Sequence, residues 1–344
     1  MTIKLGVSLY SFQEDYYLGK LDLEGCIAKA ANEIGAEGIE VLPDQMPLPS
    51  YPNYTEEDID KWLAWMDKYK TTPTSYSIGI NYTMFKNRMW TVDEYLDDIV
   101  GSIKRAKQLG FKIVRNGILK KEDLEVYEKA IPAAEHYGIQ LCTEIHAPRS
   151  IRSWYTQDLI EMIQRTGTKH LGFVVDFGIF NKGMPVPLKK RLIREGGNEQ
   201  ILNYIDEGYR NKQIPTEDEV RKMGGGNIEL SFRNQTDHYI YDDPELLKEV
   251  IAYTQYCHGK FYEMDENCED VSVDYEGPLR VLKENGFNGY IGSEYEGQRH
   301  YFEQGCDIYM DPIEQVRRHH VMMRKYLGEQ SHEQVASDKN KVID

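Results

Sequence analysis

Short apolar runs alternate with longer amphipathic segments along most of the chain. Eight runs have the length and composition of buried strands, at residues 3–12, 38–43, 72–81, 111–117, 139–148, 171–180, 258–264 and 288–297. The segments between and after them carry apolar residues at helical spacing, at residues 23–34, 55–69, 91–109, 121–137, 157–165, 244–256, 275–284 and 311–327. Repeated strand–helix units with eight strands predict an α/β fold, a parallel (β/α)8 TIM barrel.

The alternation breaks between residues 181 and 241, a segment rich in charged residues and glycine. A connection of this length is usually functional or mobile. Because it follows the sixth predicted strand, we expect it to rise over the active face as a lid, a subunit-docking insertion or a mobile loop. Residues 1–328 are therefore predicted to form a single TIM-barrel domain, and the polar tail at 329–344 is expected to be disordered.

The charge balance narrows the class of partner. Lys and Arg number 41 against 57 Asp and Glu, which leaves a net charge of −16 among the 344 residues. Such a chain has no electrostatic footprint for nucleic acid or an anionic membrane surface. The five scattered cysteines lack zinc-knuckle spacing, the chain begins directly with a strand pattern, and no apolar run approaches 18 residues. We therefore expect a cytoplasmic protein with reduced thiols and no membrane segment.

Polar residues near the carboxyl ends of the fifth to eighth predicted strands are candidate metal ligands. They are Glu144, Asp176, His258 and Glu294. In a parallel barrel these strand ends meet at one face, and three carboxylates with one imidazole suit Mn²⁺, Mg²⁺ or Co²⁺. The alternative is that each carboxylate caps a strand or pairs with an arginine, and that His258 is a satisfied core histidine. Four such residues on consecutive strands favour the metal site, because unpaired buried carboxylates are costly.

His146 follows Glu144 by two residues, so both side chains point to the same face of a strand. A neutral imidazole beside a Lewis-acidic ion can remove a proton next to a carbonyl group. The alternative is that His146 only orients Glu144. We favour His146 as the catalytic base.

Other polar residues near strand ends are candidates for substrate binding. Tyr10, Glu40 and Arg115 could each point into the pocket, although Glu40 and Arg115 could equally pair with each other. Arg299 and His300 follow the eighth strand, where they would bind a polar substrate group or face solvent. The sequence contains no P-loop and no GxGxxG after a strand, so we expect no nucleotide cofactor.

The four candidate ligands stand in the segments CTEIHAP, VVDFG, CHGKFYEMD and GSEYEG. In these segments, and over residues 3–297, the chain resembles the xylose isomerase-like barrel superfamily. Its members hold a divalent ion by Glu, Asp, His and Glu from successive late strands, which implies the same role for the four residues here. Ketose 3-epimerase-like members carry a histidine and an arginine where this chain has Ile179 and Met264. This difference speaks against simple epimerisation of a free ketose. The acidic composition does not match the basic groove of endonuclease IV.

The segments TEIHAP and GSEYEG, with the long insertion, are most similar to the catalytic α subunit of bacterial C-glycoside deglycosidases. This resemblance implies a carbon–carbon lyase, with Mn²⁺ as the favoured ion, acting on a flavonoid or other aromatic 3-oxo-C-glucoside. His146 would remove the C2 proton and the aglycone would leave by β-elimination. The resemblance also implies a small β subunit in a hetero-oligomer.

Two other functions are compatible with the same residues. One is a sugar isomerase, epimerase or dehydratase that works through a metal-stabilised enediolate. A phosphorylated sugar is the less favoured substrate, because GSEYEGQR offers only Arg299 as a cationic partner. The other is a metal-stabilised binding or assembly subunit without catalysis.

Overall fold

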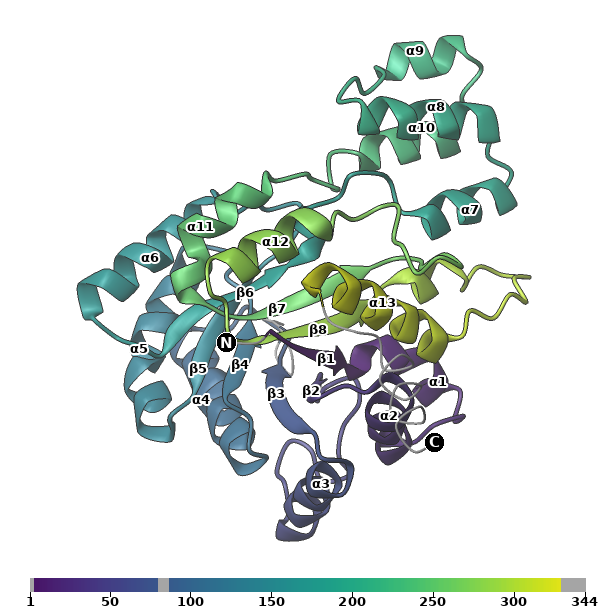
Figure 1. Ribbon diagram of the computed structural model, residues 1–344. Coiled ribbons are helices and arrows are strands. Elements are labelled where there is room, and N and C mark those ends of the chain that lie inside the picture. Colours follow the sequence, from purple (N-terminus) through teal and green to yellow (C-terminus); the bar gives the residue numbers. More distant parts are fainter. Residues whose placement is uncertain (1–2, 80–86, 329–344) are drawn as a thin grey trace.

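The structure is a computed structural model, and it describes residues 3–79 and 87–328. Its centre is a closed barrel of eight parallel strands, in which each strand pairs with its neighbours along the chain and β1 pairs with β8. The strands are β1 (Lys4–Ser8), β2 (Gly38–Val41), β3 (Thr72–Ser77), β4 (Ile113–Asn116), β5 (Gln140–Ile145), β6 (Leu171–Asp176), β7 (Thr254–Phe261) and β8 (Tyr290–Tyr295). The predicted TIM barrel is confirmed (Figure 1).

Helices connect the strands and cover the outside of the barrel. The helices outside the insertion are α1 (Gln13–Tyr17), α2 (Leu23–Lys29), α3 (Glu56–Tyr69), α4 (Val92–Gln108), α5 (Glu122–Tyr137), α6 (Trp154–Thr166), α11 (Leu247–Val250), α12 (Glu276–Glu284) and α13 (Pro312–Leu327). Single turns are η1 (Leu9–Phe12), η2 (Ala30–Ile34), η3 (Phe177–Ile179), η4 (Pro244–Leu246), η5 (Ile251–Tyr253) and η6 (Gly297–His300). The hydroxyls of Thr55 and Thr91 accept hydrogen bonds from backbone N–H groups in the first turns of α3 and α4.

Several strands end earlier than their apolar runs predict. The sixth run extends to residue 180, but β6 ends at Asp176 and the buried turn η3 follows. Apolar residues continue past the strand end because the turns on this face of the barrel are themselves buried.

The helix predicted over residues 244–256 is confirmed only in part. Residues 244–253 form three short helical elements, η4, α11 and η5, and β7 begins at Thr254. The register of β7 against β6 pairs Phe173 with Thr254 and Asp176 with His258. This pairing overrides the helical spacing of the apolar residues and places His258 inside a strand, not at its start.

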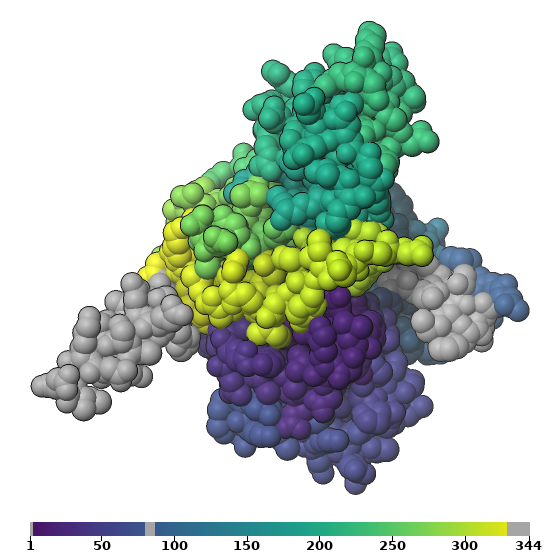
Figure 2. Space-filling view, turned by 90° about the vertical axis from the view of Figure 1, so that its right-hand side faces the viewer, coloured from purple at the N-terminus to yellow at the C-terminus, as the bar shows by residue number. Residues whose placement is uncertain are grey.

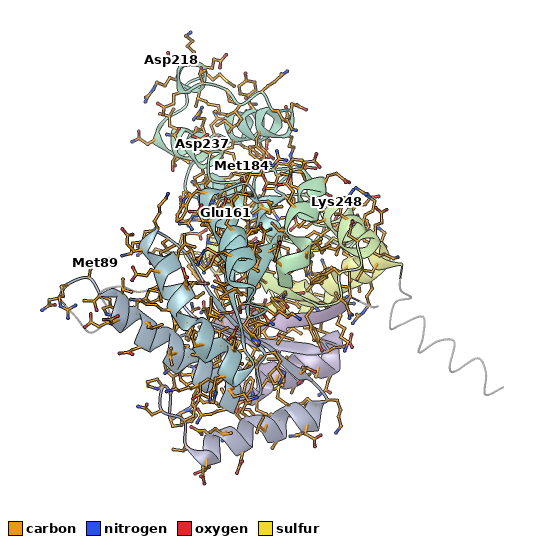
Figure 3. The ribbon with its side chains drawn as sticks, turned by 90° about the vertical axis from the view of Figure 1, so that its left-hand side faces the viewer. Met89, Glu161, Met184, Asp218, Asp237 and Lys248 are labelled. Atoms are coloured by element: carbon orange, nitrogen blue, oxygen red, sulfur yellow. The ribbon has the colours of Figure 1, made fainter. Side chains whose placement is uncertain are left out.

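The insertion between β6 and β7 folds as a helical lobe. Its helices are α7 (Val186–Arg194), α8 (Glu199–Arg210), α9 (Glu217–Lys222) and α10 (Asn227–Gln235). Their apolar faces form a separate small core that includes Leu202, Ile205 and Phe232. The lobe rises beyond the barrel in Figure 2, and Figure 3 shows Asp218 at its tip with Met184 and Asp237 near its base.

Two backbone strips tie the base of the lobe to the barrel. Phe180 and Tyr241 form an antiparallel bridge where the chain enters and leaves the insertion. The Tyr209 hydroxyl lies 2.9 Å from the carbonyl oxygen of Asn181 and 2.8 Å from that of Tyr239. The strip that returns to the barrel is therefore held against the strip that leaves it.

Other expectations concern the chain as a whole. The disorder expected for residues 329–344 falls outside the described residues, and the single-domain assignment stays a prediction. None of the five cysteines forms a disulfide, and Cys26, Cys142 and Cys257 are buried. Within the described part of the chain, no helix is long and apolar enough to cross a bilayer.

Close packing inside the barrel makes Gly292 of β8 sensitive to substitution. A Cβ atom at this position would lie 1.8 Å from the hydroxyl oxygen of Tyr256, whose ring is fully buried. We expect Gly292→Ala to lower the free energy of unfolding by roughly 1–3 kcal/mol, because the ring has no room to move aside. Urea denaturation followed by circular dichroism measures this change.

The matched control is Gly79→Ala, at an exposed position after β3. The nearest atom to a Cβ there is the Asp44 Oδ2 at 3.5 Å, an ordinary contact, so the change should stay within about 0.5 kcal/mol. Equal unfolding midpoints for the two variants would contradict the packing argument.

Candidate metal centre and adjoining pocket

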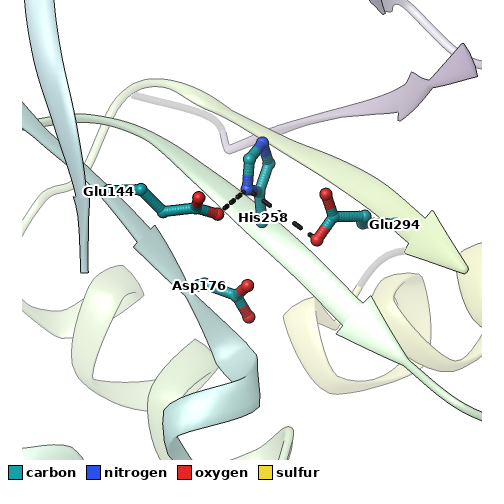
Figure 4. A group of neighbouring side chains, drawn as sticks. All are labelled: Glu144, Asp176, His258 and Glu294. Atoms are coloured by element: carbon teal, nitrogen blue, oxygen red, sulfur yellow. Dashed lines mark hydrogen bonds and ion pairs between the residues drawn. The ribbon is translucent and has the colours of Figure 1, made fainter. Parts of the chain in front are cut away.

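Four consecutive strands bring the predicted ligands to one point. Glu144, Asp176, His258 and Glu294 come from β5, β6, β7 and β8, and each offers one oxygen or nitrogen atom within 4.8 Å of the others. Figure 4 shows the three carboxylates arranged around the imidazole. The buried cluster of acids and one histidine could hold a divalent ion. The role of each residue as a ligand stays a prediction.

Carboxylates hold both ring nitrogens of His258. Its Nδ1 lies 2.5 Å from Glu144 Oε1 and 3.9 Å from Glu294 Oε2, and its Nε2 lies 2.9 Å from Glu40 Oε2. Glu40 is completely buried and also accepts a hydrogen bond from the Ser8 hydroxyl at 2.8 Å. With Nε2–H donating to Glu40, the Nδ1 atom faces the cluster as the nitrogen that can bind an ion.

We expected Glu40 to bind substrate, but the structure places it elsewhere. Its carboxylate lies behind His258, away from the pocket, where it orients the ring. The alternative pairing of Glu40 with Arg115 is also not seen. The Arg115 guanidinium instead lies 3.5 Å from Glu144 Oε2.

Cations at the edge of the cluster stabilise its negative charge. Burial alone would raise the pKa of Glu144, but Arg115 and His258 hold it well below its usual range. Burial likewise raises the pKa of Asp176, to about 6, although the ammonium of Lys260 opposes the rise. Lys260 Nζ lies 2.6 Å from Asp176 Oδ2 and 3.3 Å from Glu294 Oε2.

The donor atoms fit a hard or borderline divalent ion. Asp176 Oδ2 and Glu294 Oε2 are buried and accept no hydrogen bond of good geometry from the described residues, although both lie near the Lys260 ammonium. Oxygen atoms with free lone pairs beside an oriented imidazole nitrogen match the ligand preferences of Mn²⁺, Mg²⁺ or Co²⁺.

A second layer of residues lies two positions along the chain beyond each candidate ligand. This layer consists of His146, Gly178, Lys260 and Glu296, and all four line a pocket of about 300 Å³. Lys260 is the only one of the four inside a strand, and its ammonium contacts Asp176 and Glu294, so the pocket adjoins the candidate ligands. The other three lie just past the ends of β5, β6 and β8. A Cβ at Gly178 would lie 2.9 Å from Lys260 Cδ, so glycine leaves room for the lysine stem.

His146 presents one free ring nitrogen to this pocket. Its Nδ1 lies 2.5 Å from the carbonyl oxygen of Ala147. A carbonyl can only accept, so Nδ1 carries the hydrogen in the neutral ring and Nε2 keeps its lone pair. The structure contains no hydrogen bond between His146 and Glu144, both of which are described residues. The ring is thus available to act as a base.

The remaining predicted substrate residues surround Glu296. The Tyr10 hydroxyl donates to Glu296 Oε2 at 3.1 Å, and Arg299 Nε lies 3.0 Å from the same oxygen. The Arg299 guanidinium also lies 5.0 Å above the Tyr10 ring. Arg299 and His300 line the pocket, whereas Tyr10 is almost fully buried and supports Glu296.

Several pocket residues were not among the predictions. Lys260 lies two residues after His258, and the alternation within β7 could have identified it. His238 and Tyr239 come from the return of the insertion, and Tyr262 follows β7. No pattern within residues 181–241 indicates that its last residues reach the pocket.

Comparison with known proteins matches this architecture. A family model described as "Xylose isomerase-like TIM barrel" matches residues 28–326. The "C-glycoside deglycosidase alpha subunit" of Arthrobacter globiformis is 27% identical over 336 residues, covering 95% of this chain and 93% of that protein. The "3'-dehydrocarminate deglycosidase alpha subunit" of a Microbacterium species is 26% identical, with coverages of 95% and 96%.

Solved structures share the fold at low sequence identity. The D-psicose 3-epimerase of Clostridium cellulolyticum has a TM-score of 0.59 at 12% identity, covering 95% of this chain and all of that one. A sugar phosphate isomerase/epimerase of Parabacteroides distasonis has a TM-score of 0.55 at 10% identity, with coverages of 95% and 96%.

Metal binding is expected to release about one proton at pH 7. Burial alone would lower the pKa of His258, but Glu40, Glu294 and Glu144 raise it well above the usual value, so we expect the metal-free ring to be protonated. An ion that binds Nδ1 must displace that proton, and affinity should rise with pH. Titration calorimetry with Mn²⁺ in buffers of different ionisation enthalpy counts the protons. A binding enthalpy independent of the buffer would contradict this protonation state.

Glu40→Gln tests the orientation of His258. Removing the charge behind the ring should weaken Mn²⁺ binding by about 10- to 100-fold, as for other residues that hold a metal-binding histidine. Competition with a chelator measures the affinity. Glu37→Gln, at an exposed position three residues earlier, is the control and should change nothing. Equal affinities for both variants would show that Glu40 does not position the ring.

Proposed function

The chain belongs to the xylose isomerase-like TIM barrel family, and on this basis we propose that it is the α subunit of a C-glycoside deglycosidase. Its substrate would be a 3-oxo-C-glycoside, from which it would remove the aglycone by breaking the carbon–carbon bond at C1. The proposal is supported by relatives named as deglycosidase α subunits that match along almost the whole chain. The proposal also agrees with the free ring nitrogen of His146 in the pocket that adjoins the candidate ligands.

The chemistry of this bond explains why an oxidised sugar is needed. Acid-assisted hydrolysis by paired carboxylates acts on glycosidic oxygen and does not help with a carbon–carbon link. A carbonyl at C3 makes the proton on C2 acidic. Removal of that proton forms a C1–C2 double bond as the bond from C1 to the aglycone breaks. The aglycone carbon keeps the electron pair and takes up a proton.

His146 is the base in this proposal. The free Nε2 atom of its ring is the observation that supports the proposal most directly. Its Nδ1–H is directed to the Ala147 carbonyl oxygen, so Nε2 is the atom that would take the C2 proton. Glu144, Asp176, His258 and Glu294 would hold Mn²⁺, or Mg²⁺ or Co²⁺. The ion would supply positive charge beside the sugar oxygens, where negative charge develops.

Other pocket residues would bind the sugar. Lys260 and Arg299 carry N–H donors on the pocket wall, and Glu296 is held between them as an acceptor, 3.6 Å from Lys260 Nζ and 3.0 Å from Arg299 Nε. Donors and acceptors in this arrangement suit neighbouring sugar hydroxyls. A substrate analogue that lacks one of these hydroxyl or carbonyl groups would leave Lys260, Arg299 or Glu296 without a hydrogen-bond partner, and would therefore bind more weakly.

A partner subunit is part of the proposal. The relatives are named as α subunits, which implies that a second subunit accompanies them. We therefore propose a hetero-oligomer with a small β subunit. His146 and Arg299 are exposed at the pocket, so a partner that covers this face would exclude water from the reaction.

A metal-dependent epimerase is the second candidate, because the solved structures with this fold include epimerases. One observation weighs against it. The histidine and arginine of the ketose 3-epimerase pattern are replaced by Ile179 and Met264, which are 0% and 1% exposed. Neither side chain offers a polar group to a sugar.

The decisive experiment follows a 3-oxo-C-glucoside with an aromatic aglycone by NMR in D2O. With the Mn²⁺-loaded protein and a small partner subunit, free aglycone and the unsaturated sugar should appear together. His146→Ala should lower the rate by roughly 10²- to 10⁴-fold, the usual contribution of a general base. Its metal content should be unchanged.

The control variant is His136→Ala, an exposed histidine on α5, which should keep full activity. Deuterium entering C2 while the carbon–carbon bond survives would favour the isomerase or epimerase instead. No conversion of any kind by a metal-loaded complex would favour a binding subunit.

A further inference from the structure

A second and larger cavity, of about 800 Å³, lies at the base of the insertion. The strip of residues 238–241 separates it from the pocket that adjoins the candidate ligands, because Tyr239 lines both. Its volume is within the range of small-molecule binding sites. None of the steps proposed for the lyase uses this cavity.

Aromatic and aliphatic side chains form the walls of the cavity. Tyr209, Tyr239 and Tyr241 contribute rings, and Ile214 and Ile240 contribute aliphatic surface. Tyr209 is fixed because its single hydroxyl hydrogen is shared between two carbonyl oxygens at the base of the lobe. Flat aromatic molecules gain contact area from rings that are held in this way.

Cations outnumber acids around the same cavity. Lys182 and Lys212 line it and form no ion pair with a described carboxylate, and Lys212 Nζ lies 5.4 Å from the centre of the Tyr241 ring. Arg210 is already paired with Asp206, at 3.2 Å. The one acid in the lining, Asp274, accepts hydrogen bonds from the Tyr241 hydroxyl and the Gly277 N–H. In a chain of net charge −16, this local excess of cations favours an anionic ligand.

We propose that the cavity binds an aryl carboxylate, an aromatic molecule that carries one carboxylate group. The ring lies among the three tyrosines, and the carboxylate lies near Lys182 and Lys212. This binding is independent of the lyase activity proposed above.

Titration calorimetry of the whole, Mn²⁺-loaded chain with cinnamate tests the proposal. We expect saturable binding to one site. Cinnamyl alcohol, which has the same ring but lacks the charge, should bind more weakly. The double variant Lys182→Glu/Lys212→Glu should bind the acid at least about tenfold more weakly, since two attractive charges become repulsive. Both lysines are exposed, so the variant should fold.

The matched control is Lys222→Glu on α9, an exposed lysine of the same lobe outside the cavity lining, which should bind like the unaltered protein. Repeating the titration without metal should give the same affinity. Binding that requires Mn²⁺ would place the acid in the other pocket and overturn the proposal. Absence of saturable binding, or equal affinity in the double variant, would also overturn it.

Discussion

Four carboxylates, those of Glu40, Glu144, Asp176 and Glu294, are buried within contact distance of His258 or of one another at the centre of the barrel. Charges of one sign this close repel and lose their hydration, so the arrangement persists only with compensation. Arg115 and Lys260 supply that compensation, and the carboxylates around His258 raise the pKa of its ring, which favours a third positive charge. The strand register that aligns these groups is therefore under a strong electrostatic constraint, and the rest of the site is built on it.

Sequence alone predicted the barrel and the convergence of the four candidate ligands, because the alternation of a strand fixes which side chains share a face. Lys260 follows the same rule and could have been recognised with them. The start of β7 could not be predicted from the sequence, because the apolar residues there have helical spacing. Only the pairing with β6 makes these residues a strand. The presence of His238 and Tyr239 in the pocket could not be predicted either, because it depends on how the whole insertion folds back onto the barrel.

The candidate ligands and the layer of residues beyond them differ in what they indicate about the reaction. The two solved structures described above align at only 10% and 12% identity, so they show the shared fold alone, and a barrel of this kind does not determine the reaction. In this chain the layer beyond the candidate ligands holds a free imidazole nitrogen, an ammonium group and a carboxylate held by an arginine. In the proposed reaction those groups, and not the shared fold, would decide where a proton is taken and which substrate atoms are recognised.

The strip of residues 238–241 links the insertion to the shape of the pocket, and this link has a consequence for evolution. The strip forms a wall of the pocket that adjoins the candidate ligands, yet its position is set by a lobe with its own small core. Mutations in that lobe can move the wall without touching the buried charges of the barrel. Lineages that diverge in the lobe would therefore acquire new substrate ranges while the reaction itself is inherited unchanged.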